Sequence, residues 1–321
     1  MTPGGSVSRM PLPAPSRLLL AGRDAARLAA DLAGALPAVE TRTVAHGDLT
    51  PEDAAWAEGY CGFTVPANLA ASGVRWVHLP MAGVDRVAPA LRGTDVVLTR
   101  TVGGMPRAIG SYVLAHLLAD AWQLREYAAQ QARAEWRPLG PARVDGRGVV
   151  VLGTGEIGSG VAEVLRAAGY RAVGVNTHGR AAAAFDDVVA LADAGPHLAS
   201  CTALVNALPL TDGTRGLVDG RMLAQLDGAV VVNVGRGATL EPEDLRSALD
   251  AGHVRHAVLD VLETEPLPSA DWRWSHPRVT LTPHVSGPTE HEDVVAALVA
   301  AHTALTEGRR PPHVVDLDRG Y

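Results

Sequence analysis

A glycine-rich turn in the middle of the chain limits the possible folds more than any other feature. The apolar run at 148–152 predicts a buried strand, GTGEIG follows at 153–158, and we predict a helix over 159–168 and a strand over 170–176. In this order the first glycine makes the turn, the second lets a pyrophosphate approach the backbone, and the third lets helix and strand pack closely. The phosphates then lie at the helix N-terminus, where free N–H groups favour negative charge. The turn therefore predicts dinucleotide binding by Gly153, Gly155, Glu156, Ile157 and Gly158.

The rest of the chain alternates short apolar runs with amphipathic stretches. This pattern is typical of βαβ units and of a parallel sheet covered on both faces. The 321 residues suggest about two domains, and residues 1–147 precede the glycine turn. We expect the last helix to pack back onto the first domain, with a cleft between the two. The predicted helices cover 23–36, 107–133 and 291–305, and the other predicted strands cover 17–22, 75–79, 203–207, 229–234, 257–260 and 279–281.

Charge and cysteine content disfavour several classes of protein. The formal net charge is -7, which argues against nucleic-acid binding, because that function needs a basic face to neutralise phosphates. The two cysteines, Cys61 and Cys201, are too few for a disulfide framework, so we expect reduced thiols and a cytoplasmic location. The apolar run at 18–21 is too short to span a bilayer. We therefore predict no membrane partner, and we predict no metal site.

The residues after the second strand of the nucleotide unit bear on the choice of cofactor. An enzyme that binds NAD usually has Asp or Glu here, which bonds the ribose hydroxyls, whereas one that binds NADP has a cation nearby. This chain has Asn176 and then Arg180. No carboxylate repels a 2′-phosphate and Arg180 could pair with it, so we favour NADP(H), with NAD(H) as the alternative. In that alternative Arg180 is only a solvated loop residue.

Three polar motifs follow predicted strands in the second half of the chain. Reduction of a 2-oxo acid needs a cation for the carboxylate, a proton donor for the developing alkoxide and a group that orients the donor. Arg236 lies between glycines that would let a substrate come close, and it suits a bidentate carboxylate contact. His284 can donate a proton near neutral pH, and a nearby Glu265 would fix its ring. Because ligands bind outside the carboxyl ends of strands in such sheets, we expect these loops to converge.

These motifs resemble those of the D-isomer-specific 2-hydroxyacid dehydrogenase family. The matching strings are 151–158, 208–211 with 214–217, 233–237, 259–268 and 282–284, and the first domain matches more thinly, chiefly at 81–85. The resemblance implies an α/β fold of two doubly wound, parallel-sheet domains. A Rossmann NAD(P)-binding domain over 103–287 would be inserted into a flavodoxin-like substrate domain made of 1–102 and 288–321. The implied activity is hydride transfer between NAD(P)H and a small 2-oxo or 2-hydroxy acid, and the implied assembly is a homodimer.

The resemblance also assigns roles to individual residues. Arg236 would bind the substrate carboxylate, with Glu265 and His284 as the acid/base pair. Asp260 would hold the nicotinamide carboxamide, and backbone N–H groups around Ala82 would complete the carboxylate site. The other implied cofactor contacts are Leu208, Pro209 and Thr214, and the implied substrate contacts are Ala82, Gly83, Arg236 and Trp274.

Within the family the chain is similar to the glyoxylate/hydroxypyruvate reductase A type. The similarity rests on Tyr127, Gln131 and Trp136, and on the segment 274–279, which begins with Trp274 and has a further tryptophan before it at Trp272. In relatives of this type a tryptophan here lies near the substrate mouth, and the alternative is that these aromatic side chains simply cover the loop. The family usually has Ala-Glu where this chain has Gly-Ser at 110–111. That departure means that the resemblance does not predict the details of the interdomain hinge or of the substrate loop.

Other functions are compatible with the same fold. A cofactor-sensing regulator without physiological turnover would keep the same site residues, so turnover of a 2-oxo acid would separate it from an enzyme. A formate dehydrogenase would have Gln in place of Glu265, and a phosphite dehydrogenase would need a lysine that 78–84 lacks. We expect no regulatory domain after His284, and an L-lactate-type enzyme would begin with its glycine turn. The sequence identifies neither the 2-oxo acid nor the direction of the reaction.

Overall fold

In the computed structural model the chain forms two compact units. The structure describes residues 14–45, 47, 49–69 and 72–321. Unit 1 contains the described residues up to Gly104 together with Thr289–Tyr321, and unit 2 is Met105–Pro288. The chain therefore enters unit 2 once and leaves it once. Which unit holds the substrate stays a prediction.

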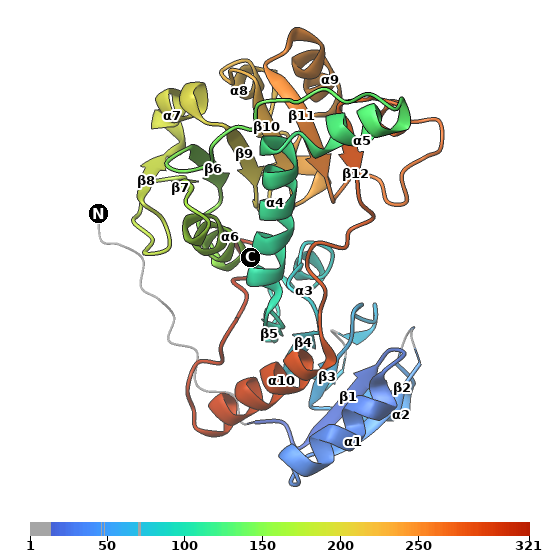
Figure 1. Ribbon diagram of the computed structural model, residues 1–321. Coiled ribbons are helices and arrows are strands. Elements are labelled where there is room, and N and C mark those ends of the chain that lie inside the picture. The colour runs from blue at the N-terminus through green and yellow to red at the C-terminus, as the bar shows by residue number, and fades with distance from the viewer. Residues whose placement is uncertain (1–13, 46, 48, 70–71) are drawn as a thin grey trace, which may run out of the picture. The chain divides into compact units, whose positions relative to one another are not determined.

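Unit 1 is built on a five-stranded parallel sheet (Figure 1). Its elements are β1 (Arg17–Ala21), α1 (Ala25–Ala35), β2 (Glu40–Val44), α2 (Pro51–Trp56), β3 (Gly59–Cys61), β4 (Trp76–Leu79), α3 (Ala88–Leu91), β5 (Val97–Arg100) and α10 (His291–Thr306). The strand order β2-β1-β3-β4-β5 is the order 2-1-3-4-5 of flavodoxin-like folds. Successive residues of a strand point to opposite faces, so Leu18 and Leu20 pack with α1 and α10 while Leu19 enters the other core.

Unit 2 contains a seven-stranded parallel sheet (Figure 1). Its strands are β6 (Gly148–Leu152), β7 (Arg171–Asn176), β8 (Asp187–Ala190), β9 (Ala203–Asn206), β10 (Ala229–Asn233), β11 (Val254–Leu259) and β12 (Val279–Leu281). Its helices are α4 (Met105–Ala121), α5 (Leu124–Ala132), α6 (Glu156–Ala167), α7 (Gly195–Ser200), α8 (Gly220–Leu223), α9 (Pro242–Ala251) and the short η2 (Leu191–Asp193), η3 (Gly237–Thr239) and η4 (Trp272–Trp274).

The strand order of unit 2 locates the expected ligand site. The order is β12-β11-β10-β9-β6-β7-β8, and counted from β6 it is the Rossmann order 3-2-1-4-5-6 with one further strand at the edge. The direction of winding reverses between β6 and β9. Ligands of such sheets bind at this reversal, outside the carboxyl ends of the strands. The glycine turn follows β6 directly and therefore lies at this reversal. Both units have the doubly wound, parallel architecture that the resemblance implies.

Three predicted elements differ from the observed ones by three residues or more. The helix predicted over 107–133 is wrong, because it is two helices, α4 and α5, separated at 122–123. Gln123 has a left-handed backbone with a φ of 54°, which interrupts the helix although apolar periodicity continues. The helix after the glycine turn begins at Glu156 rather than at 159, with Gly155 as its N-cap. β11 begins at Val254, before the predicted start at 257.

Glycines allow close packing of α4 on α6. A Cβ on Gly160 would lie 2.3 Å from the Cβ of Pro106, and a Cβ on Gly110 would lie 2.8 Å from Cγ2 of Val164. Real Cβ atoms essentially never approach that closely, so both positions need glycine while the helices keep this separation. The departure from the usual family residue at 110 thus has a packing reason.

Two further observations concern the composition. Cys61 and Cys201 are buried free thiols, and they lie in different units. Among the residues that the structure describes, no helix combines the length and the apolar character that crossing a membrane requires.

Candidate active site

The three glycines of the 153–158 turn are needed for three different reasons. Gly153 has a φ of 95°, which residues with a side chain rarely adopt. A Cβ on Gly155 would meet no atom within 4 Å, so a ligand can approach its backbone. A Cβ on Gly158 would lie 1.9 Å from the carbonyl oxygen of Gly153, so this position admits no side chain. Because Glu156 and Ile157 form the first turn of α6, these residues fit the pyrophosphate of a dinucleotide.

The side chain of Asn176 builds the turn at 176–180. Its Oδ1 accepts hydrogen bonds from the backbone N–H groups of His178 at 3.1 Å and Arg180 at 3.0 Å. Its Nδ2 donates to the carbonyl of Arg180 at 2.8 Å and to Oγ1 of Thr154 at 3.0 Å. Both donors and both acceptor positions of the amide are thus used within the chain. Asn176 shapes the turn, and its direct contact with a ribose stays a prediction.

Arg180 leaves this turn with its side chain exposed. Among the residues that the structure describes, none forms a hydrogen bond or ion pair with its guanidinium group. A guanidinium group suits an anion such as a phosphate, because it offers several N–H donors in a planar fork. The geometry is compatible with a 2′-phosphate at this turn.

The loop after β9 lies against the glycine turn. A Cβ on Gly153 would lie 3.1 Å from the carbonyl oxygen of Ala207. Within the loop, Oγ1 of Thr214 donates a hydrogen bond to the carbonyl of Pro209 at 2.6 Å. Leu208, Pro209 and Thr214 therefore belong to one loop beside the turn that fits a pyrophosphate. Their contacts with a cofactor are a prediction from the resemblance.

A buried polar network supports the loop that carries Arg236. Asn206 donates from Nδ2 to Oδ1 of Asn233 at 3.1 Å and to Oγ1 of Thr239 at 2.6 Å. Thr239 in turn donates to the carbonyl of Arg236 at 2.6 Å, and Nη1 of Arg236 donates to the carbonyl of Gly235 at 2.7 Å. The sequence reasoning missed this network. Its signal is an asparagine that ends an apolar strand, at Asn206 and again at Asn233.

The glycines beside Arg236 do not have the role that the sequence suggested. A Cβ on Gly235 would lie 2.6 Å from the carbonyl oxygen of Leu208, and one on Gly237 would lie 1.9 Å from the carbonyl carbon of Leu262. The expectation that they leave room for a substrate is wrong, because neighbouring backbone fills that space. The glycines instead allow the loop after β10 to touch the loops after β9 and β11.

The predicted acid/base residues meet at the ends of β11 and β12. Nδ1 of His284 lies 2.9 Å from Oε2 of Glu265. The other carboxylate oxygen of Glu265 accepts a hydrogen bond from the N–H of Leu262 at 2.9 Å. His284 has a φ of 55°, a conformation that is uncommon for residues with a side chain and is enriched at functional sites. With Nδ1 engaged by Glu265, Nε2 is the ring nitrogen that can exchange a proton with a ligand.

Asp260 holds the loop that carries His284. Its Oδ1 accepts from Oγ1 of Thr282 at 2.6 Å and from the N–H of Val285 at 2.9 Å, and its Oδ2 accepts from the N–H of Ser286 at 3.0 Å. The carbonyl of Asp260 accepts from the N–H of His284 at 2.8 Å. The residue is 1% exposed. The structure thus gives Asp260 a supporting role, whereas contact with a nicotinamide is a prediction from the resemblance alone.

Tyr112 extends this network to α4. Its hydroxyl lies 2.6 Å from Oγ1 of Thr282. Thr282 uses its only proton to donate to Asp260, so Tyr112 is the donor in this contact. Burial raises the pKa of Tyr112 to about 12, which keeps that proton in place at neutral pH. The sequence reasoning did not single out Tyr112, because a tyrosine within an apolar helix carries no distinctive signal.

The other predicted substrate contacts are Ala82, Gly83 and Trp274. Ala82 and Gly83 follow β4 in unit 1, where Nη1 of Arg100 donates to the carbonyl of Ala82 at 2.8 Å. Trp274 lies in η4 with an exposed ring, and its Nε1 donates to the carbonyl of Pro268 at 3.0 Å. Among the described residues, no group of three or more His, Cys, Asp or Glu side chains could hold a metal ion.

Comparison with known proteins identifies the family. Residues 114–286 match the model of the D-isomer specific 2-hydroxyacid dehydrogenase, NAD binding domain. The glyoxylate/hydroxypyruvate reductase A of Serratia proteamaculans is 34% identical over 91% of this chain and 95% of its own length. This identity extends well beyond the nucleotide-binding unit.

Solved structures are similar over almost the whole chain. A D-isomer specific 2-hydroxyacid dehydrogenase from Xanthobacter autotrophicus, in complex with NADPH and MES, has a TM-score of 0.88 at 27% identity, covering 95% of this chain and 100% of that one. An NADPH-dependent glyoxylate/hydroxypyruvate reductase from Sinorhizobium meliloti, in complex with NADP and sulfate, has a TM-score of 0.84 at 27% identity with the same coverage. This chain therefore belongs to the D-isomer specific 2-hydroxyacid dehydrogenase family and is an NAD(P)-dependent dehydrogenase.

Proposed function

We propose that the chain reduces a small 2-oxo acid to the D-2-hydroxy acid, with glyoxylate and hydroxypyruvate as the first candidates. The observation that carries this proposal is the 2.9 Å contact between Nδ1 of His284 and Oε2 of Glu265. It gives the proton donor and its orienting carboxylate that such a reduction needs. The similarity to reductases from Serratia proteamaculans and Sinorhizobium meliloti supports the substrate class.

In the proposed mechanism bound NAD(P)H supplies the hydride. Arg236 binds the substrate carboxylate through two N–H groups and is held in place by the network around Asn206 and Asn233. Nε2 of His284 donates a proton to the carbonyl oxygen as that oxygen gains negative charge. Glu265 keeps the ring oriented through Nδ1 and stabilises the protonated imidazole. In the reverse direction the same nitrogen takes the proton from the hydroxyl group.

We propose that NADPH is the preferred cofactor. Arg180 presents an exposed guanidinium group at the end of the 176–180 turn, and Asn176 in place of a carboxylate leaves no negative side chain after β7 to repel a 2′-phosphate. The complexes of the Xanthobacter autotrophicus and Sinorhizobium meliloti proteins with NADPH or NADP support this preference.

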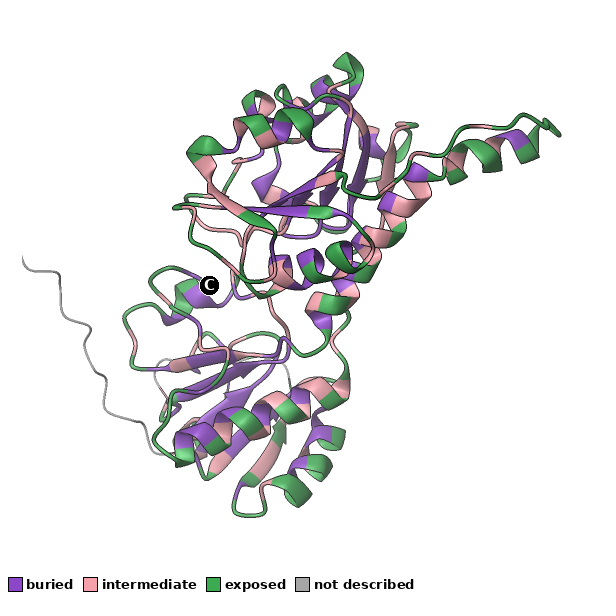
Figure 2. Ribbon diagram, turned by 60° about the vertical axis from the view of Figure 1, so that its left-hand side comes forward, coloured by how far each residue is buried: buried purple, intermediate pink, exposed green. Residues whose placement is uncertain are grey.

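We propose that the protein is a homodimer that associates through α5 and the segment after it. Most of α5 is exposed (Figure 2), and large apolar side chains are exposed at Leu124 in this helix and at Trp136 after it, the latter 100% exposed. Such clustering marks an interaction surface on a folded protein. Sedimentation velocity of the wild type and of Trp136→Glu tests the dimer, and we expect the variant to shift to the monomer.

The buried free thiols fit a reducing compartment, so we propose a cytoplasmic location.

A substrate screen tests the proposed activity. The purified chain is assayed with glyoxylate, hydroxypyruvate, pyruvate and bulkier 2-oxo acids, each with NADPH and with NADH, while oxidation of the nicotinamide is followed. We expect turnover of the small 2-oxo acids and a D-configured product wherever the product is chiral. Tight cofactor binding without turnover of any 2-oxo acid would contradict an enzyme and favour a cofactor-sensing regulator.

A further inference from the structure

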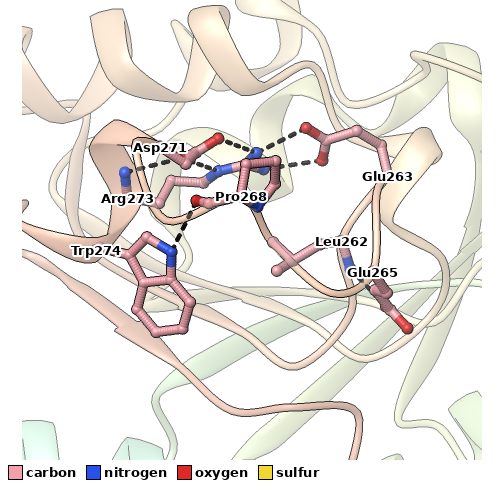
Figure 3. A network of polar contacts seen from close by, with 7 residues as sticks. All are labelled: Leu262, Glu263, Glu265, Pro268, Asp271, Arg273 and Trp274. Atoms are coloured by element: carbon pink, nitrogen blue, oxygen red, sulfur yellow. Dashed lines mark hydrogen bonds and ion pairs between the residues drawn. The ribbon is translucent and has the colours of Figure 1, made fainter.

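An ion-pair network that the proposed mechanism does not use lies between β11 and β12. Figure 3 shows Arg273 between two carboxylates. Its Nη1 and Nη2 donate to the two carboxylate oxygens of Glu263 at 2.8 and 2.7 Å. Its Nε and Nη2 donate to the two oxygens of Asp271 at 2.8 Å each. The guanidinium group is therefore bidentate toward both partners, which is the most demanding geometry an arginine offers.

The burial of Arg273 makes this network unusual. Its side chain is 5% exposed, whereas Arg255, which pairs with Asp120 in the same unit at 2.7 Å, is 38% exposed. Burial alone would lower the pKa of Arg273, but the hydrogen bonds to Asp271 and Glu263 outweigh it and raise that pKa. The hydrogen bonds from Arg273 in turn lower the pKa of Glu263 and the pKa of Asp271. All three groups are therefore charged at neutral pH.

Such a network is poor evidence of a stabilising role. Removing a charge from water is costly, and apolar side chains of similar size often stabilise a fold as well or better. A buried ion pair is better explained as a way of fixing one conformation of the chain around it.

The network connects directly to the acid/base pair. Glu263 is bonded to Leu262, whose N–H donates to Oε1 of Glu265, and the other oxygen of Glu265 contacts His284. Figure 3 shows Glu263 and Glu265 on the same short loop, with their side chains on different sides. The Glu263 anchor thus restrains the backbone N–H that orients the carboxylate of Glu265.

The network also restrains the tryptophan segment. The N–H of Arg273 donates to Oδ1 of Asp271 at 2.9 Å, and this contact starts η4. The next residue is Trp274, whose Nε1 donates to the carbonyl of Pro268 at 3.0 Å (Figure 3). A single guanidinium group therefore ties the start of the 262–274 loop to its end.

We propose that Arg273 is a positioning residue for the acid/base pair, which it serves by fixing the 262–274 loop so that Glu265 stays on Nδ1 of His284. The role rests on the proposed function only in so far as this pair is the acid/base of the reduction. Arg273 acts through Glu263 and the N–H of Leu262. It does not take part in the proton transfer itself.

The test is a double-mutant cycle between Arg273→Lys and Glu265→Gln. Lysine keeps the charge but cannot make two bidentate contacts. We expect Arg273→Lys to lower kcat by about tenfold with little change in KM, a typical coupling for groups in one network. In the Glu265→Gln background we expect a further loss below about twofold, because the residue through which Arg273 acts is already impaired. The pH at which reduction declines should move to lower values in both single variants, because each weakens the carboxylate contact that stabilises the protonated imidazole.

Two controls separate positioning from general damage. Arg255→Lys makes the same change in another ion-paired arginine of unit 2, and kcat should stay within about twofold of the wild type. Glu263→Gln is the second variant should Arg273→Lys fold poorly, because Glu263 is at the more exposed end of the network. We expect it to be non-additive with Glu265→Gln as well. Equal losses of kcat in the wild-type and Glu265→Gln backgrounds would overturn the proposal.

A measurement that needs no substrate completes the test. Hydrogen exchange at the N–H of Leu262, which donates to Glu265, should become faster in Arg273→Lys and stay unchanged in Arg255→Lys. Unchanged exchange in Arg273→Lys would contradict the proposal. If the wild type turned over no 2-oxo acid, the proposed function would fail, yet the exchange result would still decide whether Arg273 positions Glu265.

Discussion

The acid/base loops and the 176–180 turn both lie outside the carboxyl ends of strands in one parallel sheet, but they are held in different ways. Both follow parallel strands, β11 and β12 in the first case and β7 in the second. The acid/base loops depend on Asp260, which is 1% exposed, and on the buried Arg273. The turn depends on one asparagine, Asn176, which bonds its own turn and Thr154, and it ends in an exposed arginine.

The difference reflects what each region has to do. Proton transfer needs two side chains at hydrogen-bond distance, so the backbone on both sides is restrained by buried charges despite their desolvation cost. Selection between NADPH and NADH needs only a charge near an exposed phosphate. Substitutions should therefore have large effects in the first region and modest ones in the second. Four predictions test this contrast, in order of expected size.

The largest effect should come from His284→Asn. Asparagine tolerates the left-handed backbone at this position, so the loop should keep its shape. Because general acid catalysis typically contributes roughly 10²–10⁴-fold, kcat should fall by that factor. The dissociation constant of the cofactor should not change. Loss of cofactor binding together with turnover would mean that the loop, and not the proton donor, had been damaged.

Arg236→Lys should have the next largest effect. Lysine keeps the positive charge but loses the planar, two-point contact with a carboxylate. We expect kcat/KM to fall by on the order of a hundredfold, from the loss of charge-assisted hydrogen bonds. Steady-state kinetics measure kcat/KM, and a cofactor titration measures the dissociation constant of the cofactor, which should not change. Turnover close to the wild type would show that another cation binds the substrate.

The acid/base region should also be the more sensitive to acid. His256 in β11 contacts Oγ1 of Thr280 in β12 at 2.9 Å, and burial, followed by the charge of Arg125, lowers its pKa to about 4. The unfolded chain takes up a proton near the ordinary histidine pKa while the folded chain does not. Stability therefore falls as the pH decreases from about 6.5 to about 4, by roughly 2 kcal/mol at pH 5.

Urea unfolding at pH 7 and pH 5 measures this pH dependence of the free energy of unfolding. In His256→Gln the difference in unfolding free energy between the two pH values should shrink by roughly 2 kcal/mol. His178→Gln is the matched control, because it removes an exposed histidine from the 176–180 turn. An equal change in the two variants would break the contrast between the regions.

The smallest effect should come from Arg180→Ala. The exposed side chain adds a charge-assisted contact to a 2′-phosphate, so kcat/KM with NADPH should exceed that with NADH by about tenfold, and the variant should lose most of that preference. Asn176→Asp should shift the preference toward NADH, since it adds a negative charge and loses the two amide donors. A wild type that prefers NADH by about tenfold or more would show that Arg180 has no part in cofactor choice.

Local patterns predicted the glycine turn and most strands of the described chain, but they did not predict β2, β3, β5 or β8. The central strands of the unit 2 sheet are buried on both faces, so they are short apolar runs, and a glycine with a positive φ follows β6. The sequence did not predict the break between α4 and α5, because Gln123 adopts a left-handed backbone without being a residue that favours it. It also missed Asn206 and Asn233, whose network forms only when two strands lie side by side.

The sequence by itself determined the alternation of strands and helices in a parallel α/β fold, the dinucleotide turn, and Arg236, Glu265 and His284 as candidate site residues. These features depend on residue type and spacing within short segments. Only the tertiary structure decided that the Glu265 carboxylate meets Nδ1 of His284, that neighbouring backbone fills the space at Gly235 and Gly237, and which carboxylates Arg273 binds. Those contacts depend on side-chain directions and on loops that fold against one another. Neither follows a sequence period.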